Sequence, residues 1–122
     1  MTARRPAAAV APPPDLVVMR DTAATVLDED TRPEEQAALA AELVAHLHEL
    51  VPQVEELVPA RLTMTEQYCA LACLGEAHRK LSQEASPGPG GQAAHARRLA
   101  RVLVALAAHW ETLSDAGPAP GR

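Results

Sequence analysis

Two cysteines lie four residues apart, a spacing that places two sulfur atoms on one face of a helix. Cys69 and Cys73 could therefore supply two of the ligands of a soft metal ion. A structural zinc site needs two more ligands, and the chain has neither a CxxC motif nor a second cysteine pair. Because both cysteines fall opposite the leucines of their own segment, we prefer to interpret them as small residues that flank another helix or a subunit partner.

Two histidines fall within the apolar stripes of successive segments. His78 and His95 would lie near the same end of two adjacent antiparallel helices, where a pair of imidazoles can bind a metal ion, relay a proton or hold a polar ligand. The Glu-x-x-His motif of the di-iron helical bundles does not accompany them. We therefore prefer the interpretation that His95 is a partly exposed ring at the end of a bundle, and we keep both histidines as candidate ligands.

Three arginines gather where the last two predicted helices meet. Arg97, Arg98 and Arg101 form a basic patch that could bind an anion or an acidic protein partner. The alternative is that the acidic residues within 28–35 reach the same end and neutralise the patch. Surface ion pairs of that kind contribute only about 0–1 kcal/mol each.

The chain has only two aromatic residues, Tyr68 and Trp110. On two antiparallel helices with equal rise per residue, these positions fall at the same level. We expect them to share one layer of the core, and we interpret that layer as packing rather than as a ligand site.

The composition favours helices and excludes several classes of function. Alanine accounts for 26 of the 122 residues and aromatic residues for 2%, whereas strands favour β-branched and aromatic residues. The net charge of −5 opposes nucleic-acid binding. Glycine-rich nucleotide loops, Gly-x-Ser-x-Gly and His-Glu-x-x-His are all missing from the sequence, so no catalytic residue and no cofactor is indicated. Without a disulfide framework or a membrane-spanning run, we expect a cytoplasmic protein.

Prolines and glycines divide the chain into four helical segments. Asp15 can cap the first helix, and Thr31 with Glu34 forms a capping box before the second. Pro52 should kink the second helix or divide it near Leu50. The predicted helices span residues 15–28, 33–58, 64–84 and 92–114.

Each predicted helix has one apolar stripe that can face a common core. On the third helix the expected core-facing residues are Met64, Tyr68, Leu71, Leu74, Gly75, His78 and Leu81. Four such helices joined by short loops pack most simply as an all-α, up-down-up-down antiparallel four-helix bundle. We predict that this bundle spans residues 15–114, between disordered tails at 1–14 and 115–122.

Segments 69–77 and 95–101, with Ala105-Leu106 and His109-Trp110-Glu111 beyond them, resemble a small actinobacterial family of streptomycete type. The family has unknown function and carries the generic label of natural product biosynthesis protein. The resemblance covers about residues 35–113. It implies an all-helical cytoplasmic protein encoded near secondary-metabolite or regulatory genes, but it supplies no catalytic residue. His78 stands where the family pattern has arginine.

We predict a non-enzymatic helical module that associates with itself or with a protein partner through its helix faces, in secondary metabolism or its regulation. The indications are the lack of a catalytic constellation and the apolar residues outside the main stripes, such as Val18 and Val104. The alternative is a small-ligand or metal-binding bundle that acts as an accessory enzyme in natural product biosynthesis. It would use the two histidines at one end or the two aromatic residues at the other.

Overall fold

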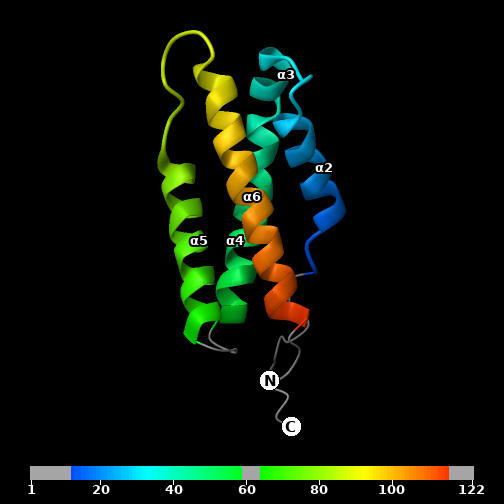
Figure 1. Cartoon of the computed structure of the whole chain (residues 1–122), viewed down its shortest axis with the longest axis vertical. Helices are drawn as coiled ribbons and strands as arrows, with labels where there is room; N and C mark the ends of the chain where they lie inside the picture. Colours follow the sequence, from blue (N-terminus) through cyan, green and yellow to red (C-terminus); the bar gives the residue numbers. More distant parts are fainter. Residues whose placement is uncertain (1–11, 59–63, 116–122) are drawn as a thin grey trace, which may run out of the picture.

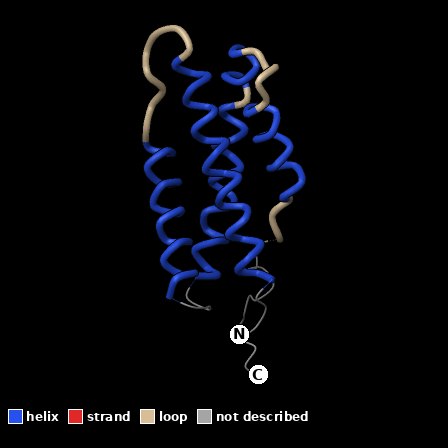
Figure 2. The backbone as a smooth tube through the Cα atoms, in the orientation of Figure 1, coloured by secondary structure: helices blue, strands red, loops and turns tan. Residues whose placement is uncertain are grey.

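The computed structural model describes residues 12–58 and 64–115, and within these ranges it contains helices and no strand (Figures 1 and 2). The prediction of an all-helical chain is confirmed for these residues. The predicted tails, 1–14 and 115–122, lie almost wholly outside them. The helices are α2 (Leu16–Leu27), α3 (Pro33–Ala38), α4 (Ala40–Leu57), α5 (Met64–Ser82) and α6 (Gly91–Asp115).

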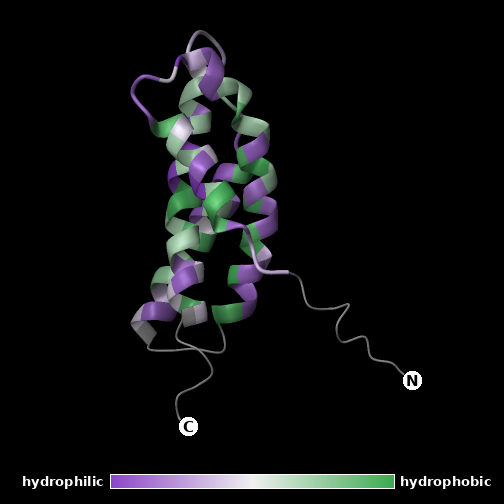
Figure 3. Cartoon of the chain, turned by 90° about the vertical axis from the view of Figure 1, so that its right-hand side faces the viewer, coloured by the Kyte–Doolittle hydropathy of each residue, from purple (hydrophilic) through white to green (hydrophobic). Residues whose placement is uncertain are grey.

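The four long helices lie side by side, and successive ones run in opposite directions (Figure 1). The short α3 and the loop between α5 and α6 lie at the same end. The last helix, α6, contacts all four of the other described helices, whereas α5 packs mainly on α4 and α6. Hydrophobic and hydrophilic residues alternate along the ribbons, as amphipathic helices require (Figure 3).

The first helix begins as predicted. The capping box before the second predicted helix lies one residue away from its predicted position. The Asp15 carboxylate accepts a hydrogen bond from the backbone N–H of Val18 at 3.2 Å. Before α3, Glu35 rather than Glu34 accepts from the cap residue, the backbone N–H of Arg32, at 3.3 Å. Thr31 lies one residue outside the cap, and its hydroxyl donates to the Thr25 carbonyl at 2.6 Å. The box is shifted by one residue because Pro33 is the first helical residue.

The second predicted helix is interrupted at Leu39 and not near Leu50. The backbone N–H of Leu39 is shared between two carbonyls, those of Glu35 and Gln36, each at 3.2 Å. Beyond this turn α4 continues through Pro52 to Leu57. Pro52 is exposed, so the carbonyl that loses its helical donor lies on the solvent side, where it needs no partner within the protein.

Three of the four predicted apolar stripes form the core as expected. The side chains of α2, α4 and α6 interlock in one continuous cluster. Its largest fully buried members are Met19, Leu43, Leu47, Leu50, Leu99, Leu103, Leu106 and Leu113. Trp110 is partly buried against this cluster.

The predicted orientation of the third helix is wrong by about 100° about its axis. Of the predicted stripe, Leu74 is buried and Leu81 is partly buried against the core. The buried residues of α5 are Ala70, Leu74 and Ala77, while the side chain of Tyr68 is 76% exposed and that of Leu71 55% exposed. The expected aromatic layer of Tyr68 and Trp110 is therefore not a layer of the core. A pattern that places the large side chains in the core selects the wrong face of this helix. Small alanines let α5 approach its neighbours closely, and this leaves its larger residues outside.

The glycine-rich loop before α6 needs glycine at specific positions. Gly88 and Gly90 have φ angles of 99° and 79°, which L side chains rarely adopt. A Cβ on Gly91 would lie 1.9 Å from the Ser86 carbonyl oxygen. The loop thus closes tightly on the first residue of α6, which sets the level at which α6 begins beside α5.

Candidate functional site

A groove between α5 and α6 gathers several of the residues that the sequence singled out. It has a volume of about 350 Å³ and is open to solvent. An apolar floor is flanked by charged side chains, and the lining residues are Cys73, Glu76, Lys80, Arg98, Arg101, Val102 and Ala105. We refer to it below as the α5/α6 groove. It forms because the small residues Cys73 and Ala105 leave space between the two helices.

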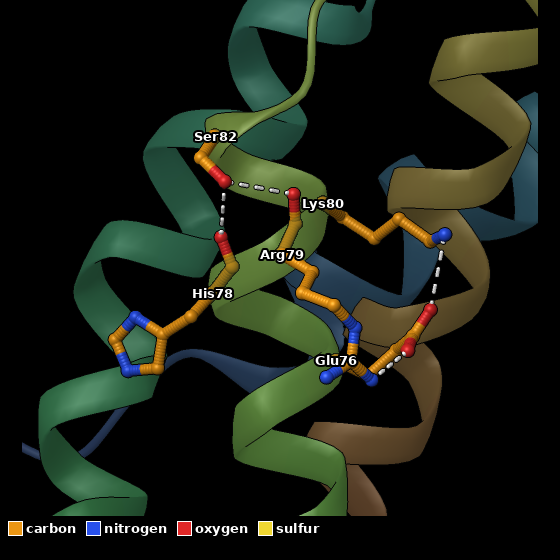
Figure 4. A network of polar contacts seen from close by, with 5 residues as sticks. All are labelled: Glu76, His78, Arg79, Lys80 and Ser82. Atoms are coloured by element: carbon orange, nitrogen blue, oxygen red, sulfur yellow. Dashed lines mark hydrogen bonds and ion pairs between the residues drawn. The ribbon is translucent and has the colours of Figure 1, made fainter.

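The charges of this groove are unevenly paired. Glu76 contacts the guanidinium of Arg79, and its other carboxylate oxygen lies 3.0 Å from Nζ of Lys80 (Figure 4). These two partners, Arg79 first, hold the pKa of the Glu76 carboxyl below its ordinary value. By contrast, Arg98 and Arg101 have no hydrogen-bonded or ion-paired partner within residues 12–58 and 64–115. The groove therefore holds two guanidinium groups that are not engaged by the described residues.

The two cysteines have different surroundings, and their role as a pair of metal ligands stays a prediction. Cys69 is exposed, whereas Cys73 is half-buried in the α5/α6 groove. Burial, and secondly the nearby charge of Glu76, raise the pKa of the Cys73 thiol and so favour its neutral form. Among the described residues no group of three or more His, Cys, Asp or Glu side chains could hold a metal ion.

The two candidate histidines are not brought together. The ring of His78 points away from Glu76 and Lys80 toward α4, where its Nε2 lies 3.0 Å from a carboxylate oxygen of Glu55 (Figure 4). His95 is partly buried near Lys80 and Arg98, and its Nδ1 atom is buried without a hydrogen-bond partner. Burial, and then the charges of Arg98 and Lys80, lower the pKa of His95. The expected pairing of the imidazoles is wrong because the true core face of α5 directs His78 toward α4.

The predicted arginine patch is divided between two surroundings. Arg97 donates from Nη1 to the side-chain oxygen of Gln36 at 3.0 Å, while Arg98 and Arg101 line the α5/α6 groove. No ion pair joins any of these three arginines to the acidic residues of 28–35 in the part of the chain that the structure describes. The hypothesis that those residues neutralise the patch therefore stays a prediction. Adjacent helical residues point about 100° apart, so Arg97 and Arg98 reach different neighbours.

Two residues have places in the tertiary structure that the sequence did not indicate. Gln36 is buried, donates to the Val26 carbonyl at 2.6 Å, and accepts from Arg97. Gly75 lies on α5 in a second depression of about 330 Å³, on the α4 side of that helix. A glutamine in a short helix and a glycine in a long one could not be assigned such places without the tertiary structure.

The fold and the grooves define a class: an all-helical protein whose candidate sites are open grooves between helices. None of its described helices combines the length and the apolar character that a membrane span requires. Residues 17–115 match DUF6415, a family of unknown function, and the chain belongs to this family. The match extends beyond the 35–113 segment of the expected resemblance. No curated protein and no solved structure matches the chain.

Proposed function

We propose that this protein is a non-enzymatic interaction module that binds an acidic, amphipathic helix of a partner protein in the α5/α6 groove. The observation that carries the proposal is a pair of guanidinium groups, those of Arg98 and Arg101, that have no partner among the described residues and lie beside an apolar floor. The scaffold we propose is an antiparallel four-helix bundle in which α3 forms an extra turn before α4. The cytoplasmic location and the role in secondary metabolism or its regulation are part of the proposal. The location derives from the cysteine usage, the apolar pattern and the sequence resemblance, and the role derives from the resemblance.

Charge favours an acidic occupant over a basic one. The chain as a whole carries a formal charge of −5, yet this groove has two arginines without partners in the part of the chain that the structure describes, and a lysine that shares one carboxylate. Guanidinium groups bind carboxylates with two parallel hydrogen bonds, which fixes orientation as well as adding affinity. A glutamate-bearing partner would supply the groups that the groove lacks.

Shape favours a helix as the occupant. The groove runs between two long antiparallel helices, and its floor is formed by Cys73, Val102 and Ala105. An amphipathic helix can place leucines at positions i, i+3 and i+4 on such a floor while its glutamates reach the rim. The outward position of Val104, 41% exposed on α6, adds apolar surface to the same helix.

A peptide titration tests the proposal directly. The probe is a fluorescein-labelled helical peptide with leucines on one face and glutamates beside them, and its binding is measured by fluorescence anisotropy. We expect the double variant Arg98→Glu, Arg101→Glu to weaken binding by at least about tenfold, or about 1.4 kcal/mol. The matched control is Arg32→Glu, which reverses an exposed arginine at the start of α3 and should bind like the unchanged protein. Equal binding by all three proteins contradicts the proposal.

A photo-crosslinking experiment tests the natural partner. A benzophenone amino acid replaces Ala105 in the groove, and in a control protein it replaces the exposed Ala41 of α4. We expect the Ala105 position alone to crosslink to an acidic amphipathic segment in lysate from the native cells, identified by mass spectrometry. A basic segment, or equal crosslinking from both positions, contradicts the proposal. If only a small molecule is captured at Ala105, the accessory-enzyme alternative is favoured instead.

A further inference from the structure

Gly75 lies in the middle of α5, where the fold itself gives no reason for glycine. Its φ angle is not positive, and a Cβ at this position would meet only Nη1 of Arg79, at an ordinary contact distance of 3.7 Å. A glycine in a helix interior destabilises it by about 0.5–1 kcal/mol relative to alanine. Nothing in residues 12–58 and 64–115 requires the missing side chain, so the glycine leaves room for a close approach by another surface.

The surroundings of Gly75 combine a depression with two projecting side chains. The depression has a volume of about 330 Å³ and is lined by Glu55, Val58, Leu71, Leu74, Gly75 and His78. Leu71 and Tyr68, one and two turns before Gly75, are 55% and 76% exposed. An apolar knob and an apolar hole therefore lie on the same helix face.

The intervals between the residues of this face are the same when they are read from either end of α5. Residues 68, 71, 75 and 78 are separated by three, four and three positions. When two copies of α5 pack antiparallel about the midpoint between Leu71 and Gly75, each Leu71 lies opposite the other copy's Gly75. Tyr68 then lies opposite His78. A two-fold interface requires this reciprocity, in which residue i meets j and j meets i.

The polar end of Tyr68 finds a partner in the same arrangement. His78 is bound to Glu55 at 3.0 Å, so the Glu55–His78 pair of the second copy falls at the level of the Tyr68 hydroxyl. A phenol O–H can donate to that carboxylate while its ring covers apolar surface. The occupant that complements this face in both shape and chemistry is the face itself.

We propose that the outer face of α5, formed by Tyr68, Leu71, Gly75 and His78, is a two-fold homodimer interface in which Leu71 of each copy enters the depression at Gly75 of the other. This proposal is independent of the partner helix above, because the α5/α6 groove lies on the opposite flank of α5. A single pair of helices buries less than the roughly 1,600 Å² of a standard interface, so we expect micromolar affinity.

Sedimentation velocity on the full chain, across a concentration series that brackets this affinity, tests the interface. We expect the unchanged protein to shift from the 12.9 kDa monomer to a dimer as concentration rises. Gly75→Ala should raise the thermal midpoint of the monomer, because alanine is the better helix former, and yet weaken dimerisation by at least about tenfold. A merely structural glycine would not give these two opposite effects. Since Gly75→Ala does not threaten folding, the result is interpretable on its own.

A matched pair of charge insertions separates this face from general surface hydrophobicity. Leu71→Glu should abolish the dimer, while Val104→Glu on α6, a side chain 41% exposed, should leave it intact. The proposal is overturned if the unchanged protein remains a monomer throughout, if Gly75→Ala dimerises as well as the unchanged protein, or if Val104→Glu weakens the dimer as much as Leu71→Glu.

Disulfide trapping tests the antiparallel register. In a background of Cys69→Ser and Cys73→Ser, the variants Tyr68→Cys and His78→Cys are mixed and oxidised. We expect disulfide-linked dimers in the mixture and not in either variant alone, because position 68 of one copy lies opposite position 78 of the other and not opposite itself. Efficient linkage of Tyr68→Cys to itself would show a parallel arrangement and overturn the proposal.

Discussion

The two helices α6 and α5 use their residues in opposite ways. The buried face of α6 carries large side chains, among them Leu99, Leu103 and Leu106, and α6 contacts every other described helix. The buried face of α5 consists mainly of Ala70, Leu74 and Ala77, and its large residues Tyr68 and Leu71 point outward. One helix stabilises the fold, and the other is held by small residues that leave its large ones available for contacts with other molecules.

Both candidate surfaces follow from this difference. The α5/α6 groove exists because α5 and α6 meet through small residues beside it, and the outer face of α5 is apolar because its leucine and tyrosine are not needed in the core. If the comparison is correct, substitutions on α6 should change the free energy of unfolding strongly. Those on the outer face of α5 should change association instead.

The largest expected effect comes from truncating one leucine on each helix. Leu103→Ala on α6 removes a side chain that is 1% exposed and should lower the free energy of unfolding by about 2–5 kcal/mol. Leu71→Ala on α5 removes an exposed side chain and should change it by no more than about 0.5 kcal/mol. Urea unfolding at protein concentrations that keep the chain monomeric measures both. Similar losses in the two variants would break the comparison.

The same contrast explains what the sequence could predict. On α2, α4 and α6 the largest apolar residues are also the buried ones, so a count at helical period finds the core face. On α5 that count ranks Tyr68 and Leu71 above Ala70 and Ala77, and it selects the wrong face. Alanine occurs on both surfaces of helices throughout this chain, so its position alone cannot show which face is buried.

The candidate sites were predictable only in their residue types. The basic character near Arg98 and Arg101 follows from the sequence, but Arg97 turns to Gln36 because the turn at Leu39 brings α3 against α6. The predicted pairing of the two histidines is wrong because it depended on the predicted orientation of α5, the helix that carries His78. The place of Gly75 in a depression can be recognised only when the positions of Glu55 and Val58 beside it are known.

A smaller effect is expected at the polar anchor between α3 and α6. Gln36→Met keeps the volume of the side chain but leaves the Val26 carbonyl and the Arg97 guanidinium without their partner. We expect a loss of about 1–3 kcal/mol in the free energy of unfolding, because the groups left behind are partly buried. The matched control is Gln53→Met, a partly exposed glutamine of α4, which should change stability little. Equal effects of the two substitutions would show that α6 is not held by this contact.

The smallest expected effect comes from replacing His95, which lies near the start of α6 beside α5. Burial, and then the charges of Arg98 and Lys80, lower the pKa of His95 below its ordinary value of 6.5. The unfolded chain therefore takes up a proton at a higher pH than the folded one. The stability conferred by the neutral ring is fully present above the unfolded pKa and is lost as the pH falls through the folded one.

Replacing that ring should flatten the pH dependence. We expect His95→Gln to lose less stability than the unchanged protein when the pH is lowered from about 8 to about 5, as measured by urea unfolding at each pH. Equal slopes for the unchanged protein and His95→Gln would mean that the imidazole is not desolvated. In that case α5 would not pack closely against the start of α6, and the comparison between the two helices would not hold at this end.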